Sequence, residues 1–449
     1  MAEFFNTYLI GKLFSDFPVD HWLGFVIAAV IHCVLYLHVI AVGALFFIWL
    51  ERKVSGRIQD RLGPTRVGGK FGWLQTLADG IKLIAKEDIT PGTADPLLFK
   101  IAPYISLAAS LTAFFALPFA SGWVGQNLNH AAFFVLAIMG LEVFGVIFAG
   151  YASGSKWSLF GGMREAAQVV SYEVPVGMCV LIPVMLCGTM NLTTIGDRQA
   201  GLFTNWLFFH DPFTFITAFV FFTCGMASVN RAPFDLAEAE SELVAGFHTE
   251  YSGLRWSLFF MAEYGTMFIV SALAVILFFG AWHGPIPIFS GAGFAESTWE
   301  LPVVGIQPLP YIAALAGCVN FIGKATFGVI VMIWIRWTFP RLRVDQVISM
   351  CWKYCVPILA FCFLGVLAWQ YFNLPTFNRL PAVRESWVQQ TVEPAPPVEA
   401  AVQSPLPCEP QQEFRERSSL SEGEGPAEVN KAVSTTNQNK TLATTGGIR

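Results

Sequence analysis

Long apolar runs alternate with short polar segments along most of the chain. Each run is continuously apolar, whereas the strands of a membrane barrel alternate apolar and polar residues over short segments. A helix needs about 20 mostly apolar residues to cross a bilayer. Eight runs meet this condition, at roughly 22–50, 101–121, 131–151, 166–190, 213–230, 256–282, 310–336 and 349–373. The pattern predicts an all-α polytopic membrane protein with eight transmembrane helices.

Composition supports this fold class and excludes others. Of the 449 residues, 54% are hydrophobic and only 13% are charged, whereas soluble domains carry about 25% charged residues. The formal net charge of −5 provides no basic surface for DNA or RNA. An ordinary soluble enzyme, a disordered protein and a nucleic-acid binder are therefore excluded.

Three regions follow from the same pattern. Residues 1–21 precede the first run and lack the basic region and cleavage site of a signal peptide. Residues 22–375 form the predicted eight-helix membrane domain. Residues 376–449 are rich in Pro, Glu, Ser, Gln and Thr, a composition typical of disorder.

The distribution of Lys and Arg predicts the orientation in the membrane. Of the basic residues before the tail, 17 lie in or beside alternate loops, and only Lys12 and Arg198 lie on the other side. Cytoplasmic loops carry the excess of positive charge. We therefore expect a multi-pass protein of a bacterial-type inner membrane, with both termini outside. The predicted cytoplasmic loops are 51–100, 152–165, 231–255 and 337–348.

The first cytoplasmic loop contains a helical pattern from Trp73 to Lys86. One stripe is polar and consists of Gln75, Asp79, Lys82 and Lys86. The opposite stripe is apolar and consists of Trp73, Leu74, Leu77, Ile81 and Ile84. This arrangement predicts an amphipathic helix at the membrane surface. A lipid-facing anchor whose polar face is merely solvated is the alternative.

The third cytoplasmic loop is unusually acidic. Its carboxylates are Asp235, Glu238, Glu240, Glu242 and Glu250. Asp235 followed by Glu238 fits a capping box and predicts a helix start there. A solvated acidic loop is the alternative, although cytoplasmic loops usually carry positive charge.

Ionisable residues also occur within the apolar runs. Glu142, Glu173, Glu263 and Lys324 each sit among apolar neighbours. A charge at the bilayer centre costs about 2.5–3.5 kcal/mol on insertion scales. For any single group, a hydrogen bond between helices is the alternative. Together, the four groups favour a path for protons or ions.

No cofactor motif accompanies these groups. The nine cysteines show no metal-binding spacing, and the sequence contains no Walker A motif, HExxH motif or GxGxxG fingerprint after a strand. Any redox chemistry must therefore be supplied by partner subunits.

The polar loops closely resemble one family, over about residues 20–375. The first match runs from Glu51 to Pro64 and continues through Leu77–Leu83, and the second runs from Arg231 to Gly253. Further matches are Ser171-Tyr172-Glu173 and Ile335-Arg336 with Pro340–Gln346. These motifs are similar to those of the ND1 family, which supplies the H-type membrane subunit of proton-pumping NADH-quinone oxidoreductase, respiratory complex I.

The resemblance implies roles for several groups of residues. The quinone chamber would be lined or shaped by Glu51, Arg52, Arg57, Arg61, Asp79 and Lys82. A proton path would include Asp235, Glu238, Glu240, Glu242, Glu250, Glu173 and Glu142. The interface with the hydrophilic arm would include Arg231, Arg336, Arg341 and Asp345. Quinone would be the substrate, with FMN and iron–sulfur clusters on partner subunits and other complex I subunits as neighbours in the bilayer.

One position departs from the family pattern, and two other functions remain as alternatives. Many members carry a glutamate three residues before the arginine of the RxPFD motif, where this chain has Ser228. The first alternative is the membrane subunit of a related energy-converting hydrogenase, which neighbouring genes would distinguish. The second is a stand-alone secondary transporter, for which inverted repeats would be expected.

Overall fold

The computed structural model describes residues 22–284 except 239, and residues 308–374 except 373. The predicted N-terminal segment 1–21 and the tail 376–449 lie outside the described residues. Within the described part, the secondary structure is helical and no strand occurs. The α-helices are α3 (Trp22–Ile58), α4 (Gln75–Ala85), α5 (Pro96–Phe115), α6 (Ala131–Ala152), α7 (Lys156–Cys187), α8 (Leu192–Arg198), α9 (Pro212–Ser228), α10 (Glu240–Leu243), α11 (Gly253–Phe278), α12 (Pro308–Thr338), α13 (Val344–Met350) and α14 (Val356–Tyr371).

Shorter helical turns join some of these elements. Three are 3-10 helices, η2 (Phe203–Asn205), η3 (Leu207–Phe209) and η4 (Gly246–His248), and η5 (Cys351–Cys355) is a π-helix that leads into α14. Six stretches in the described part are long and apolar enough to cross a membrane. They are Pro96–Phe115, Ala131–Ala152, Lys156–Cys187, Gly253–Phe278, Ile312–Thr338 and Val344–Tyr371. The prediction of a helical, polytopic membrane protein is confirmed.

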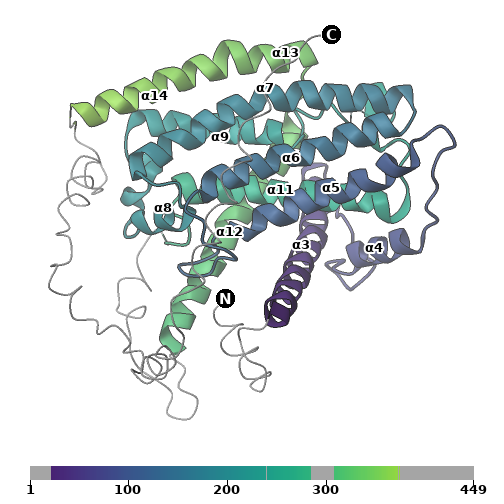
Figure 1. Ribbon diagram of the computed structural model, residues 1–449, viewed down its shortest axis with the longest axis horizontal. Helices are drawn as coiled ribbons and strands as arrows, with labels where there is room; N and C mark the ends of the chain where they lie inside the picture. The colour runs from purple at the N-terminus through teal and green to yellow at the C-terminus, as the bar shows by residue number, and fades with distance from the viewer. Residues whose placement is uncertain (1–21, 239, 285–307, 373, 375–449) are drawn as a thin grey trace, which may run out of the picture. The chain divides into compact units, whose positions relative to one another are not determined.

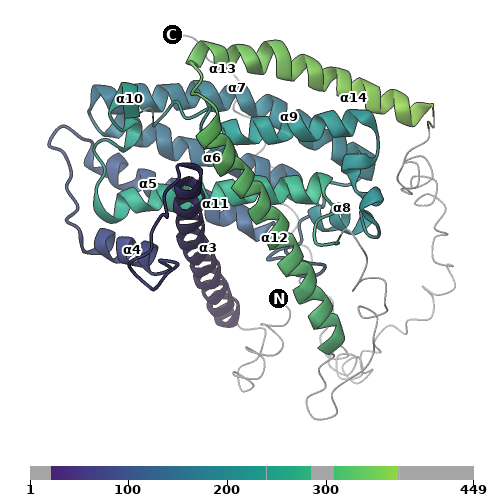
Figure 2. The same ribbon diagram turned by 180° about the vertical axis from the view of Figure 1, so that it is seen from behind.

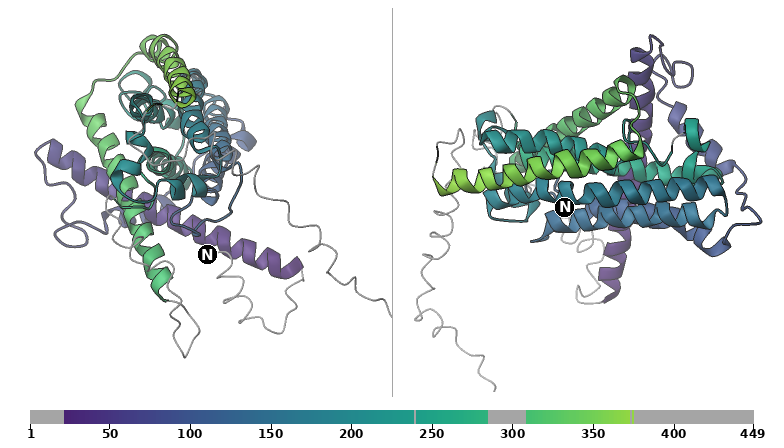
Figure 3. Two further views of the ribbon diagram at one scale, coloured as in Figure 1. Left: turned by 90° about the vertical axis from the view of Figure 1, so that its left-hand side faces the viewer. Right: turned by 90° about the horizontal axis from the view of Figure 1, so that it is seen from above.

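Most of the long helices lie side by side. Helices α5, α6, α7, α9 and α11 run along one direction, and α14 follows the edge formed by α7 and α9 (Figure 1). Helices α3 and α12 cross this bundle at a steep angle and pack against α11 (Figure 2). Figure 3 shows the same crossing from two further sides. Helix α11 is thus enclosed between the bundle and the two crossing helices.

Close packing between helices depends on small residues. A Cβ atom on Gly150 of α6 would lie only 2.7 Å from the Ser158 carbonyl oxygen of α7. A Cβ on Gly145 would lie 2.8 Å from the Ser106 nitrogen of α5. Small residues let helix backbones approach in this way, so α6 is held tightly between α5 and α7.

The acidic loop folds differently from the prediction. Residues 231–238 are not helical, and the next helix, α10, begins at Glu240. The predicted capping box at Asp235 and Glu238 is therefore wrong. The Asp235 carboxylate instead pairs with the Arg341 guanidinium at 3.2 Å. The Asp235 side chain therefore contacts the segment that follows α12 and does not cap a helix.

Candidate functional site

A buried carboxylate forms the centre of the polar end of the bundle. Glu51, near the end of α3, is only 7% exposed. Arg231 Nη1 donates to its two carboxylate oxygens at 3.2 and 3.1 Å. Arg336 and the Tyr264 hydroxyl donate to the same carboxylate. Three helices and the loop after α9 therefore meet at one carboxyl group, and we call this region the charged end.

Arg231 joins two carboxylates at the charged end. Its side chain is buried, and its Nε lies 2.9 Å from Glu263 Oε1 of α11. The guanidinium carbon also lies 4.6 Å from the centre of the Tyr264 ring. Burial lowers the pKa of Arg231, but the Glu263 and Glu51 carboxylates outweigh this effect and raise it above the ordinary value. Arg231 therefore remains a buried cation that compensates two anions.

A large cavity adjoins Glu51 between α3, α4 and α11. We call it the chamber; its volume is ≈ 560 Å³, within the range typical of small-molecule sites. Its polar lining residues include Glu51, Arg52, Asp79 and Lys82, and most of the rest of its wall is apolar. Arg52 and Asp79 form an ion pair that links α3 to α4. The chamber can therefore hold a molecule with a polar end and an apolar body.

The structure brings together four of the six residues predicted for a quinone chamber. Glu51, Arg52, Asp79 and Lys82 all line the cavity, whereas Arg57 and Arg61 do not. Both of these arginines are exposed, and Arg61 donates to the Gln59 side chain.

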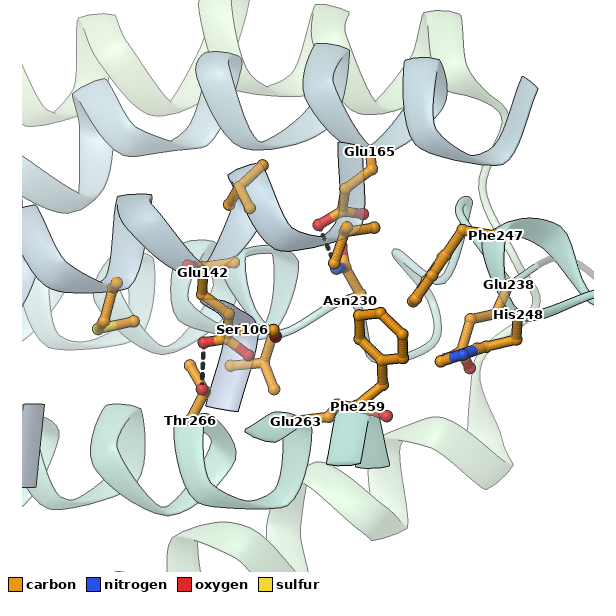
Figure 4. Close-up of a pocket in the computed structure, with 15 residues that line it drawn as sticks. Ser106, Glu142, Glu165, Asn230, Glu238, Phe247, His248, Phe259, Glu263 and Thr266 are labelled. Atoms are coloured by element: carbon orange, nitrogen blue, oxygen red, sulfur yellow. Dashed lines mark hydrogen bonds and ion pairs between the residues drawn. The ribbon is translucent and has the colours of Figure 1, made fainter. Parts of the chain in front are cut away.

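A second, smaller cavity is lined by acids. This acidic cavity lies between α5, α6, α7, α11 and the loops after α9 and α10 (Figure 4). Its carboxylates are Glu142, Glu165, Glu238 and Glu263. The Thr266 hydroxyl donates to Glu142, and the Asn230 side chain donates to Glu165. Four carboxylates from four different segments thus face one small space.

The loop side of the acidic cavity contains a carboxylate–imidazole pair. His248 Nε2 lies 2.7 Å from Glu238 Oε1. Burial works against the charged form of Glu238, but His248 more than offsets this and brings the pKa of Glu238 below its ordinary value. Nearby, burial and the Glu238 carboxylate raise the pKa of Asp235, although Arg341 opposes this shift. Two neighbouring acids are thus biased toward different protonation states.

The other predicted path residues are dispersed. Glu142 and Glu238 line the acidic cavity, but Glu242 pairs instead with Arg164 at 2.6 Å and is exposed. Glu250 is half-buried, and Glu173 is exposed on α7. The side chain of Glu240 lies outside the described part of the structure.

The residues predicted for the arm interface lie in different places. Arg231 and Arg336 are bound to Glu51 inside the charged end. Arg341 holds Asp235, and Asp345 is exposed in the first turn of α13.

Sequence analysis did not single out Glu165, one of the acids in the cavity. The apolar pattern places Glu165 in a loop, but α7 begins at Lys156 and carries it into the helix. Glu165 lies seven residues before the buried Tyr172, which is close to two helical turns. This spacing indicates that both side chains lie on the same face of α7. Sequence analysis placed Glu263 among the ionisable groups of a proton or ion path, but it did not show the ion pair with Arg231, because the two residues are distant in the sequence.

Comparison with known proteins identifies the family. The model of the NADH dehydrogenase family matches residues 31–367. This chain belongs to that family. It is 44% identical over 326 residues to the H subunit of NADH-quinone oxidoreductase from Anaeromyxobacter dehalogenans, an alignment that covers 72% of this chain and 77% of that protein. It is 43% identical over 364 residues to the H subunit from Chlorobaculum parvum, with coverage of 80% of this chain and 95% of that protein.

The resemblance found in the loop motifs is thereby confirmed. The named relatives in the NADH dehydrogenase family are subunits of an enzyme that uses a quinone. The chamber, the acidic cavity and the charged end all lie within the matched residues.

Proposed function

We propose that this chain is the membrane subunit of a proton-translocating NADH:quinone oxidoreductase, in which it forms part of the quinone chamber and of the path that couples quinone reduction to proton pumping. The observation that carries this proposal is the chamber between α3, α4 and α11. Its lining includes the polar side chains of Glu51, Arg52, Asp79 and Lys82, and much of its wall consists of apolar side chains. This polarity matches a quinone, which has a polar headgroup and an isoprenoid tail.

In the proposed chamber, the protein binds the headgroup and controls its protons. Reduction of a quinone to a quinol takes up two electrons and two protons, and the electrons would come from the FMN and iron–sulfur clusters of partner subunits. Arg52 and Lys82 can bind the headgroup oxygens. Asp79 holds Arg52 in position. Tyr264 lines the same cavity, and its hydroxyl donates to Glu51.

The proposed proton path runs from the chamber to the acidic cavity. Glu51 contacts Arg231, and Arg231 contacts Glu263, which lines the acidic cavity. That cavity offers ≈ 40 Å³ to the centres of water molecules, enough for about three waters at 10–15 Å³ each. Water there could connect Glu263 and Glu238 with Glu165 and Glu142. A change of charge in the chamber would then alter protonation along this line.

The proposed architecture has eight spans within residues 22–375. Six are the long apolar stretches, and the remaining two are α3 and α9, which has 17 residues. Helix α4 would lie at the membrane surface with its apolar residues toward lipid. The basic loops would be cytoplasmic and both termini external. Asp345 and Arg341 would face the hydrophilic arm, and Glu173 would face a neighbouring membrane subunit.

The Asp79→Asn variant tests the chamber in the assembled enzyme. Removing the charge frees Arg52 from its partner, and we expect the KM for quinone to rise about tenfold, equivalent to about 1.4 kcal/mol. NADH oxidation by a water-soluble acceptor that bypasses the chamber should not change. Kinetics of both reactions in isolated membranes provide the measurement.

The matched control is Glu242→Gln. It breaks the Arg164–Glu242 ion pair, which also joins two helical segments but does not line the chamber. Its KM for quinone should stay at the wild-type value. Equal KM values in Asp79→Asn and Glu242→Gln would contradict a quinone site in the chamber.

A further inference from the structure

Glu165 of α7 brings a carboxyl group to the C-terminal end of α9, where Ser228 is the last helical residue. The Asn230 side chain donates to Glu165 Oε1. Gln168, three residues further along α7, donates from Nε2 to Asn230 Oδ1 at 2.8 Å and to the Ala227 carbonyl oxygen at 2.7 Å. Helix α7 is thus bound to the chain on both sides of Ser228, and Ser228 and Glu165 line the same acidic cavity.

The Glu165 carboxyl group is buried but only half of it is hydrogen-bonded. The residue is 2% exposed, and its Oε2 atom has no hydrogen-bond partner among the described residues. Figure 4 shows the carboxyl group pointing from α7 toward Asn230 and the cavity. A buried acceptor without a donor is costly, so Oε2 requires either a proton of its own or a water molecule in the cavity. A group that exchanges protons with such water meets this requirement.

Two of the four carboxyl groups in the acidic cavity have basic partners, and two do not. Glu263 pairs with an arginine and Glu238 with a histidine. Glu142 and Glu165 accept instead from an uncharged hydroxyl and an uncharged amide, and neither forms an ion pair within the described part of the chain. A basic partner holds a carboxyl group in its charged form. Glu142 and Glu165 are therefore the two acids of the cavity that are freest to change protonation.

The position of the Glu165 carboxyl group matches an acid that this chain lacks. Many family members have a glutamate where this chain has Ser228, and a serine hydroxyl does not act as an acid at physiological pH. The bonds from α7 place the Glu165 carboxyl group beside this same segment. Glu165 also interacts electrostatically with Glu142 and Glu238, which Figure 4 shows on either side of it. The cavity thus has a carboxyl group next to position 228, although a different helix supplies it.

We propose that Glu165 is the proton carrier that replaces an acid at position 228, moving protons through water between Glu238 and Glu142. This inference rests on the proposed function and names a residue on which its proton path depends. A proton taken up on the Glu165 carboxylate gives the neutral acid, and release of a proton to water that leads to the next acid restores the carboxylate. Glu165 returns to its starting state, so the step needs no further reactant.

Glu165→Gln tests this role in the assembled enzyme. A glutamine oxygen still accepts from Asn230, but the side chain cannot take up a proton, so a purely structural role would be kept. Positioned proton-transfer groups contribute about 10²–10⁴-fold to rates, and we expect quinone-linked proton pumping to fall by at least about tenfold. Quenching of a pH-sensitive dye in inverted membrane vesicles measures pumping. NADH oxidation by a water-soluble acceptor measures the amount of assembled enzyme.

Two double variants test whether Glu165 replaces an acid at position 228. Glu165→Gln/Ser228→Glu returns an acid to the cavity from α9 and should restore most of the pumping. Glu165→Gln/Ser228→Gln places a side chain of the same size at position 228 without an acid, and it should pump no better than Glu165→Gln. Equal pumping in the two double variants would overturn the proposal, because the site of the acid would then have no bearing on proton movement.

Glu142→Gln distinguishes a failure of this inference from a failure of the proposed function. Normal pumping in Glu165→Gln, together with reduced pumping in Glu142→Gln, would overturn the role of Glu165 and leave the path through the acidic cavity intact. Normal pumping in both variants would contradict the path itself. If Glu165→Gln does not assemble, Glu165→Asp and Glu165→Asn replace it. These two side chains have the same size and only the aspartate titrates, so equal pumping in them would overturn the proposal.

Discussion

Two polar regions contact α11, the charged end near the middle of the helix and a second region just beyond its C-terminal end, and their polar groups are bound in different ways. At the charged end, the Glu51 carboxylate is bound by the side chains of Arg231, Arg336 and Tyr264. At the opposite end, Lys324 Nζ donates to the carbonyl oxygens of Phe279, Ala281 and His283 at 2.8, 3.1 and 2.6 Å. At the charged end, side chains bind one another. At the other end, the Lys324 side chain binds backbone carbonyl oxygens, and we call this arrangement the backbone cap.

A second side chain reinforces the backbone cap. Gln199 Nε2 donates to the Ile276 carbonyl oxygen at 2.7 Å, and its Oε1 accepts from the Gly280 nitrogen at 3.0 Å. Backbone groups cannot change their protonation state, so these contacts hold one geometry. Carboxylates joined to a tyrosine and to arginines can exchange protons. The difference suggests that coupling resides at the charged end and that the opposite end is a fixed anchor.

The largest expected effect comes from removing the cation of the charged end. Arg231→Met leaves the Glu51 and Glu263 carboxylates without their shared partner. Loss of one member of a buried ion pair costs about 3–5 kcal/mol, so we expect most of the assembled enzyme to be lost. Native gels of solubilised membranes and thermal inactivation measure this.

The control for Arg231→Met is the double variant Arg231→Met/Glu263→Gln. It neutralises Glu263, which loses its cation in Arg231→Met, and should recover part of the stability. A double variant no more stable than Arg231→Met would show that the carboxylates do not need the cation, and the view of the charged end as a balanced ionic network would fail.

The second effect is a pH dependence of the opposite end. Burial, assisted by Lys324, lowers the pKa of His283 to about 4 from an ordinary value of 6.5. In the unfolded chain, His283 is therefore protonated below about pH 6.5, whereas in the folded chain it is protonated only below about pH 4. Stability falls across this window, by about 2 kcal/mol between pH 6.5 and pH 5.

His283→Gln should remove this component, since glutamine does not titrate. Thermal inactivation of the wild type and the variant at pH 7 and pH 5 provides the comparison, because other groups contribute equally to both proteins. Parallel pH profiles for the two proteins would mean that His283 is protonated as easily in the folded chain as in the unfolded chain.

A smaller loss is expected when the backbone cap is weakened. Lys324→Met removes three hydrogen bonds while keeping a side chain of similar length. A hydrogen bond within a membrane protein contributes about 0.6 kcal/mol on average, so the loss of three bonds should lower the inactivation temperature by a few degrees. Protons pumped per NADH should stay at the wild-type value in the enzyme that assembles. A reduced pumping ratio would place Lys324 in the proton path and would erase the contrast between the two ends.

The sequence predicted the helices better than the sites, because the residues that share one face of a helix are close together in the sequence. Glu51, Arg52 and Ser55 line the chamber from α3, and their spacing places them on neighbouring faces. Arg57 lies six residues after Glu51, about one and two-thirds turns, and so turns away. Helix α3 continues beyond residue 50 to Ile58, so the first residues of the predicted cytoplasmic loop 51–100 are helical.

Contacts between distant segments were not available from the pattern. Glu51 and Arg231 are separated by 180 positions, and apolar periodicity does not show which polar groups will meet. The same reason explains Lys324, which the pattern grouped with the glutamates of the spans although its partners lie at the opposite end of α11. Only the family motifs related the first loop to the acidic loop.

The smallest effect on stability is expected for Glu173→Gln. Glu173 lies next to the buried Tyr172 on α7 but is itself exposed, and it does not line the acidic cavity. An exposed substitution usually changes stability by less than about 0.5 kcal/mol, so the inactivation temperature should stay unchanged. If Glu173 passes protons to a neighbouring subunit, pumping should nevertheless fall while NADH oxidation continues. Glu142→Gln, which changes an acid inside the cavity, is the comparison. Pumping could be unchanged in Glu173→Gln and reduced in Glu142→Gln. This result would show that the proton path in this chain includes the acidic cavity but not Glu173.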